Sequence, residues 1–207
     1  MTEFFAKRKV ALRYWLQGRN YFTALEAMEF AASYHIGTRK DGLTPEFDHQ
    51  ISICHFVRTL PDLMHEEATI ATMLLHDVPE DYDVPIKTIA DLFGEQIAEA
   101  TELLNKNDAY GRPKNHQSMI ESMAKNPIAS IGKPSDRIHN WNSMIGVFTP
   151  EKQLRYIEEG AQLIPMIKEA RRRFPRQERA YENLKHMMQS QINLITASSK
   201  APLNGEN

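Results

Sequence analysis

The stretch that most constrains the fold of this chain is an apolar run, residues 68–75, that ends in a cluster of polar side chains. Ile70 and Leu74 lie four residues apart in this run, which is the spacing of one face of a helix. His76 and Asp77 follow directly, so a buried helix would carry an imidazole nitrogen and a carboxylate oxygen at its C-terminal end. The run therefore predicts a core helix that ends at a polar site.

Pro79 lies just after this run and has no amide proton. It also disfavours the helical conformation of the residue before it, so we expect the helix of residues 66–77 to break or kink there. The carboxylates of Glu80 and Asp81 could then leave helical phase and converge with the histidine and aspartate that precede them. A first-row metal with mixed nitrogen and oxygen ligands can lower the pKa of a bound water, so this stretch is typical of the floor of an active site.

The composition limits the classes of protein to which such a site can belong. A chain of 207 residues with 42% hydrophobic and 25% charged residues is expected to form one soluble globular domain. The net charge of -2 excludes the overall basic field of a typical nucleic-acid binder, so an anionic ligand would need a local basic cluster. Cys54, the single cysteine, excludes disulfide frameworks and multi-cysteine zinc sites and suits the cytoplasm. Neither a signal peptide nor a membrane-spanning segment is predicted.

Apolar residues recur at helical spacing along the chain, and no segment alternates convincingly with a period of two. We therefore predict an all-α fold, with one domain over residues 1–196 and a polar, disordered tail over residues 197–207. The helices are predicted over residues 23–34, 46–60, 66–77, 86–93, 95–104, 117–125, 150–164 and 176–196. Residues 37–45 and 105–114 are predicted loops, and residues 132–136 a break that opens a new helix with Pro134 or Ser135 in its first turn.

The His-Asp pair by itself is weak evidence, because eight His and 27 acidic residues make one such pair unsurprising. A wider pattern is more specific. Four residues reproduce, in order, the H…HD…D pattern of the HD-domain metal-dependent phosphohydrolases: His49, His76, Asp77 and Asp136. Three segments further resemble the RelA/SpoT-type alarmone hydrolases, namely RKDG with PEFDH in residues 39–49, LLHDVPED in residues 74–81 and KPSDRIHN in residues 133–140.

The resemblance spans roughly residues 25–156, and the chain has the length of the small alarmone hydrolases, which lack the synthetase and regulatory domains. It has departures. Glu46 stands where many members have Tyr, Gln50 replaces a Pro that often follows the first His, and Pro134-Ser135 stand where Leu-Ala is usual. None of these changes removes a ligating or proton-transferring group.

The resemblance implies that the four residues of the H…HD…D pattern bind one manganese-like ion in the core of an HD-domain helical bundle. Two imidazoles and two carboxylates suit a first-row divalent metal, and a bundle can gather them from several helices. Glu80 and Asp81 are then implied as general acid or base and as the pair that orients the attacking water.

Substrate contacts are implied at five further positions. Arg39 and Lys40 would hold phosphates or stack on a purine, and Asn140 would hydrogen-bond a base or ribose. Lys114 and Tyr156 match positions that contact substrate in the family. His35 and His139 lie inside matched segments without being family ligands, so they are predicted to be structural; the basic run at residues 171–173 is predicted to be a solvated helix end.

The implied activity is manganese-dependent hydrolysis of the 3′-pyrophosphate of (p)ppGpp to GDP or GTP and pyrophosphate. An HD phosphohydrolase for another substrate, such as NADPH, a (p)ppApp-type nucleotide or a nucleotide monophosphate, would share the fold and metal site. A domain that binds a nucleotide or a partner protein without turnover is the second alternative, disfavoured by the presence of Glu80 and Asp81. The expected partner is a small nucleotide rather than a nucleic acid or a membrane; the choice of guanine or adenine and the oligomeric state stay open.

Overall fold

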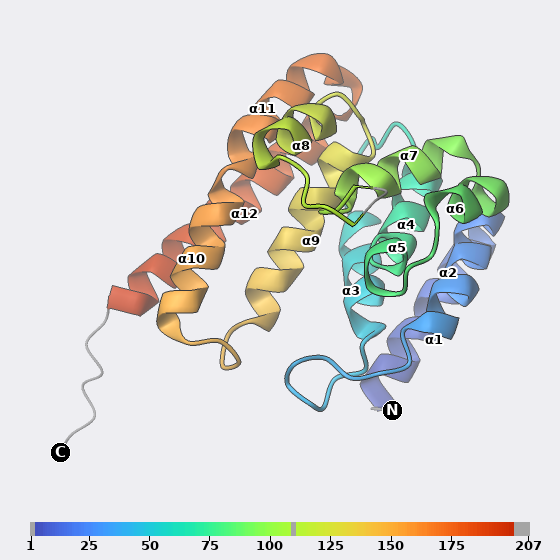
Figure 1. Ribbon diagram of the computed structural model, residues 1–207, viewed down its shortest axis with the longest axis horizontal. Helices are drawn as coiled ribbons and strands as arrows, with labels where there is room; N and C mark the ends of the chain where they lie inside the picture. The colour runs from blue at the N-terminus through green and yellow to red at the C-terminus, as the bar shows by residue number, and fades with distance from the viewer. Residues whose placement is uncertain (1–2, 109–110, 201–207) are drawn as a thin grey trace.

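The computed structural model describes residues 3–108 and 111–200, with side chains described as far as residue 198. The described residues form helices, and their only β pairing is two isolated bridges, Thr38 with Pro45 and Asn107 with Pro113 (Figure 1). The all-α prediction is confirmed. The helices are α1 (Glu3–Gly18), α2 (Phe22–Tyr34), α3 (Asp48–Val57), α4 (Glu66–Leu75), α5 (Val78–Asp81), α6 (Ile86–Phe93), α7 (Glu95–Leu104), α8 (His116–Met123), α9 (Ala129–Ser143), α10 (Pro150–Ala161), α11 (Leu163–Arg173), η1 (Pro175–Gln177) and α12 (Glu178–Lys200).

Helix α4 lies at the centre of the N-terminal half of the bundle, where it packs against α2, α3, α7 and α9. Its residues 69–75 are all buried. A helix that is apolar on every side needs neighbours on every side, which explains why the run around Ile70 and Leu74 forms the core. Helix α9 lies between this half and the C-terminal helices α10, α11 and α12, and it packs against elements of both (Figure 1). The two helices bring their polar ends to the same region.

The predicted break at residues 132–136 is wrong, because α9 continues through Pro134. The helix starts earlier, where Asn126 Oδ1 accepts hydrogen bonds of 2.9 Å from the amides of Ile128 and Ala129. Gly132 is a packing residue, since a Cβ there would lie 2.6 Å from Cε of Met73 on α4. Burial of every residue from 129 to 136 outweighs the one helical hydrogen bond that proline cannot donate.

The break near Pro79 comes two residues earlier than predicted. Helix α4 ends at Leu75, His76 and Asp77 form a turn, and Pro79 lies in the first turn of the short helix α5. The missing amide of a proline costs nothing in a first turn, where no helical acceptor faces it. The Asp81 amide donates to the Asp77 carbonyl over 2.8 Å, so one helical turn connects the His76-Asp77 pair to the Glu80-Asp81 pair.

The structure also differs from the prediction at three other helices. Helix α1 was not predicted; it buries Phe5, Leu12 and Leu16 and packs against α2 and α3. The single helix expected over residues 150–164 is two helices, α10 and α11. Helix α12 extends to Lys200, so the predicted tail does not start at residue 197, and residues 201–207 lie outside the described residues. None of the described helices combines the length and the apolar character that crossing a membrane requires.

Candidate metal centre and active site

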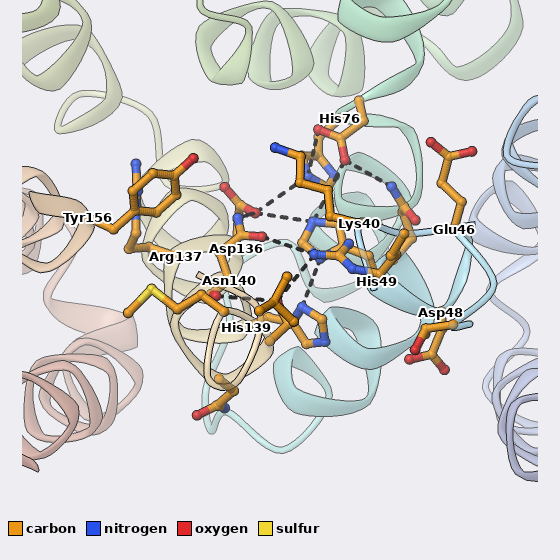
Figure 2. A pocket seen from close by; sticks show the side chains of 18 of the residues that line it. Lys40, Glu46, Asp48, His49, His76, Asp136, Arg137, His139, Asn140 and Tyr156 are labelled. Atoms are coloured by element: carbon orange, nitrogen blue, oxygen red, sulfur yellow. Dashed lines mark hydrogen bonds and ion pairs between the residues drawn. The ribbon is translucent and has the colours of Figure 1, made fainter. Parts of the chain in front are cut away.

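The four predicted metal ligands come from α3, the turn after α4, and α9. Figure 2 shows His49, His76 and Asp136 close to one another. The Nε2 atom of His49 lies 3.2 Å from Asp136 Oδ1 and 3.7 Å from Asp77 Oδ2. The Nε2 atom of His76 lies 3.1 Å from Asp77 Oδ1 and 3.8 Å from Asp136 Oδ1. Two ligands that bind a divalent ion at about 2.1 Å and at right angles are about 3 Å apart. Ligand atoms of His49, His76 and Asp77 lie within 4.8 Å of one another, and Asp136 Oδ1 lies close to both imidazoles, so this cluster is suited to hold one divalent cation.

Both imidazoles are oriented for ligation through Nε2. The Nδ1–H group of His76 donates to the Met73 carbonyl over 2.9 Å, and its Nε2 is buried without a hydrogen-bond partner among the described residues. Nδ1 of His49 lies 2.8 Å from Nδ1 of His139, which leaves Nε2 of His49 facing the carboxylates. A second polar partner that fixes the tautomer is the usual companion of a metal-binding histidine.

The electrostatics of the cluster favour a positive charge. Burial by itself would lower the pKa of His76, but the carboxylates of Asp77 and Asp136 outweigh it and raise that pKa to about 9. Burial would likewise raise the pKa of Asp136, but the Lys133 ammonium and the two imidazoles hold it well below its usual range. Without a metal, the cluster thus holds a proton between two ionised carboxylates, and a cation would take the place of that proton.

Sequence reasoning missed the side chains that hold the ligands in place. Gln50, noted only as a departure from the family pattern, donates from Nε2 to Asp77 Oδ2 over 2.9 Å. Lys133 is buried and places its ammonium 3.4 Å from Asp136 Oδ2. His139, predicted to be structural, contacts His49; burial and the His49 ring lower its pKa to about 3, so it is neutral. All lie within three residues of a ligand in sequence, and Lys133 and His139 also lie in the matched segment of residues 133–140; these are the signals that could have indicated them.

Glu80 and Asp81 line the same cleft as the four ligands, a cavity of about 750 Å³. Glu80 is held by Lys106, whose amide and ammonium donate to the carboxylate over 3.1 and 2.9 Å. Asp81 is different, because burial together with the Asp77 and Glu80 charges raises its pKa to about 6. The pair thus combines one fixed carboxylate with one that exchanges a proton near neutral pH.

The opposite end of the cleft is lined by residues 38–44 of the loop that follows α2 and by the corner between α9 and α10. Arg39 Nη2 lies 3.2 Å from Ser143 Oγ, and Lys40 Nζ lies 5.6 Å from the centre of the Phe148 ring. Tyr156 also lines this end, with the guanidinium of Arg137 5.6 Å from its ring centre. In Figure 2 the metal ligands lie between Tyr156 on one side and Glu46 on the other.

Two predicted substrate contacts have other partners in the structure. The Asn140 amide donates to Asp136 Oδ1 over 2.6 Å and its Oδ1 accepts from Arg39 over 3.4 Å, so it holds a metal ligand and the loop together. Lys114 does not line the cleft; its ammonium donates to the Glu102 carbonyl at the end of α7 over 2.7 Å. A substrate role for Lys114 has no support from this position.

The basic run of residues 171–173 lies at the end of α11, where its guanidiniums pair with carboxylates of the same helix and of α12. None of these arginines lines the cleft. The position agrees with the predicted solvated helix end.

Comparison with known proteins identifies the family to which this chain belongs. Residues 27–163 match the HD domain family. The chain is 32% identical over 155 residues to the probable guanosine-3′,5′-bis(diphosphate) 3′-pyrophosphohydrolase of Synechocystis sp., an alignment that covers 69% of this chain and 20% of that protein. It is 28% identical over 137 residues to the guanosine-3′,5′-bis(diphosphate) 3′-pyrophosphohydrolase of Aquifex aeolicus, covering 64% of this chain and 19% of that protein.

The chain thus spans about a fifth of the length of these curated relatives. A solved structure of a metazoan ortholog of SpoT that hydrolyzes ppGpp shares the fold, with a TM-score of 0.64 at 20% sequence identity. That alignment covers 83% of this chain and 94% of the solved one. The resemblance to the HD-domain hydrolases of the RelA/SpoT type is confirmed.

Proposed function

This chain belongs to the HD-domain family, and from this premise we propose that it is a manganese-dependent phosphohydrolase that converts (p)ppGpp to GDP or GTP and pyrophosphate. The observation that carries the proposal is the cleft itself. It combines a site for one divalent cation, two further carboxylates and a basic, aromatic end. The names of the Synechocystis and Aquifex relatives support the same activity.

The two ends of the cleft suggest how the substrate lies. The cations of Arg39 and Lys40 suit the 5′-phosphates, and the aromatic rings of Phe148 and Tyr156 suit a purine. With the base and 5′ side held there, the 3′-diphosphate would reach the four ligands. A divalent cation bound by them would lower the pKa of a water and offset the charge of the diphosphate, and imidazole ligands favour Mn²⁺ over Mg²⁺.

The remaining carboxylates would handle the protons. Glu80, held in place by Lys106, is suited to accept a hydrogen bond from the attacking water. Asp81, with its pKa near 6, is suited to give a proton to the ribose oxygen as it leaves. Water would attack the phosphorus nearest the ribose, so that the diphosphate leaves whole.

The experiment is a nucleotide panel incubated with manganese-loaded protein, with products separated by anion exchange. The panel holds ppGpp, pppGpp, ppApp, NADPH and GMP. We expect GDP and intact pyrophosphate from ppGpp, and in ¹⁸O-water the label should appear in the pyrophosphate. Orthophosphate as the first product, or loss of a 5′-phosphate while the 3′-diphosphate survives, would favour an HD phosphohydrolase of another specificity. Metal-loaded protein that turns over no member would indicate a binding domain.

A further inference from the structure

His35 is a buried histidine that lines the cleft yet has no part in the metal cluster. It follows the last residue of α2, and only 5% of its surface is exposed. Its ring stacks on Phe47, with 5.8 Å between ring centres and 16° between planes, and meets Tyr82 edge to face at 5.0 Å. A ring packed on two sides has a fixed orientation, so the direction of its nitrogens is set by the fold.

A chain of hydrogen bonds determines which nitrogen of His35 carries the proton. The Tyr82 hydroxyl donates to Glu46 Oε2 over 2.8 Å, and burial raises the Tyr82 pKa, so the hydroxyl keeps its proton. Because the hydroxyl hydrogen of Tyr82 points to Glu46, it cannot also point to His35. In the 3.1 Å contact between Tyr82 and His35, the Nδ1–H group of the imidazole therefore donates to the Tyr82 oxygen. Burial lowers the His35 pKa, which keeps the ring neutral. Its Nε2 is then a bare acceptor.

This acceptor has no partner of its own. Nε2 of His35 is buried and makes no hydrogen bond to any described residue. A buried acceptor without a partner is costly in a folded protein, and such atoms are commonly explained by a ligand or a water. His35 lines the same cleft as His76, Asp77 and Glu80, so the missing partner of Nε2 is expected within that cleft.

The chemistry of the acceptor narrows the choice of partner. Oxygens of a diphosphate carry no hydrogen at neutral pH, so a bare Nε2 would repel them. The base and 5′ side of the substrate are assigned to the other end of the cleft, near Arg39 and Tyr156. A water that approaches the phosphorus from the side opposite the ribose has hydrogens to donate.

We propose that Nε2 of His35 accepts a hydrogen bond from the attacking water and so turns a lone pair of that water toward the phosphorus, while Glu46 and Tyr82 hold the imidazole in position. This inference rests on the proposed phosphohydrolase function and adds a second water-orienting group beside Glu80.

The first experiment needs no substrate. Long-range ¹H–¹⁵N NMR of the metal-free protein should show His35 protonated on Nδ1 and unprotonated on Nε2. In Tyr82→Phe this preference should weaken, because the acceptor of Nδ1–H is gone. Tyr34→Phe is the matched control, since Tyr34 packs on the Tyr82 ring at 5.5 Å and should leave the tautomer unchanged. A wild-type ring protonated on Nε2 would overturn the proposal.

The second experiment measures turnover of whichever panel member the manganese-loaded wild type hydrolyses. His35→Gln should lower kcat roughly 10- to 100-fold, as expected when a reacting group is misplaced, with KM and one bound manganese unchanged. Tyr82→Phe should lower kcat roughly 3- to 10-fold, and Tyr34→Phe should not change it.

Unchanged kcat in both His35→Gln and Tyr82→Phe would overturn the proposal. A rise in KM at constant kcat would make His35 a substrate contact instead, and loss of the bound manganese in His35→Gln would make His35 a metal ligand. Should His35→Gln fail to fold, Tyr82→Phe decides. A wild type active on a different nucleotide would overturn only the alarmone assignment, whereas a wild type inactive on the whole panel would overturn both proposals.

Discussion

The two ends of the cleft are built in opposite ways. At the metal end the ligands come from α3, α9 and the turn after α4; His49 and His76 are each 4% exposed, and Gln50 and Asn140 hold the carboxylates. At the other end the cations lie on the loop of residues 36–47, part of which is open to solvent. Burial allows exact placement at the first end, where chemistry needs it, while the loop can change without disturbing the core.

Asn140 is the link between these ends. Its amide donates to Asp136, and its carbonyl oxygen accepts from Arg39 at the base of the loop. Substitutions on either side of this residue should therefore separate two kinds of effect: loss of metal and turnover at the buried end, and loss of substrate affinity at the loop end.

The largest effect is expected from His76→Ala. Removal of one of two imidazoles should abolish stoichiometric manganese binding, and turnover should fall to the level of chelator-treated wild type. Metal content by elemental analysis and hydrolysis before and after chelation check this, and Mn²⁺ should restore wild type better than Mg²⁺. His116→Ala, at an exposed histidine outside the cleft, is the control. Full wild-type activity after exhaustive chelation would contradict the metal assignment.

Glu80→Gln should sharpen the comparison within the buried end. The substitution keeps the size of the side chain but removes the charge that Lys106 holds, so kcat should fall roughly 10² to 10⁴-fold with bound metal unchanged. Steady-state kinetics with parallel metal analysis measures it, and Glu121→Gln on exposed α8 is the matched control. Wild-type kcat in Glu80→Gln would make this residue a bystander and leave Asp81 as the acid or base.

Arg39→Ala tests the loop end. We expect KM to rise roughly tenfold, the effect of about 1.4 kcal/mol of lost binding, while kcat and metal content stay close to wild type. Arg172→Ala serves as control, because Arg172 is an exposed arginine outside the cleft. A tenfold loss of kcat or of metal in Arg39→Ala would show that the two ends are coupled through Asn140.

The smallest effect is a gain of stability in Asp81→Asn. The folded pKa of Asp81, about 6, is above the ordinary value of 3.8, so its ionisation destabilises the native state as pH rises from about 4 to 6. At pH 7.5 the metal-free variant should be more stable by about 1 kcal/mol, a figure reduced because the side chain is exposed.

Urea unfolding across pH measures this difference, which should vanish below about pH 4, where the carboxyl group is protonated in both states. Asp91→Asn is the control, since Asp91 pairs with Lys87 at the surface. A variant equally stable at pH 7.5 and less active would place Asp81 in the chemistry alone.

The sequence by itself determined the class of the fold and the chemistry of the site. Helical periodicity is a local property, so the all-α class could be predicted from spacing, whereas the set His49, His76, Asp77 and Asp136 was implied by the resemblance of three ordered segments to the HD-domain hydrolases. The positions of the prolines predicted the helix boundaries less well. Packing of α9 overrode Pro134, and the chain turned before Pro79 rather than at it.

Only the tertiary structure decided what surrounds the ligands. His49 meets His139 from 90 residues away, Arg39 meets Asn140 across 101, and Tyr82 reaches Glu46 across 36. Lys114, predicted from the resemblance to contact substrate, donates to the Glu102 carbonyl at the end of α7. Such pairs arise because helix packing brings together side chains that no local pattern relates, and a buried polar group must take whatever partner the packing provides.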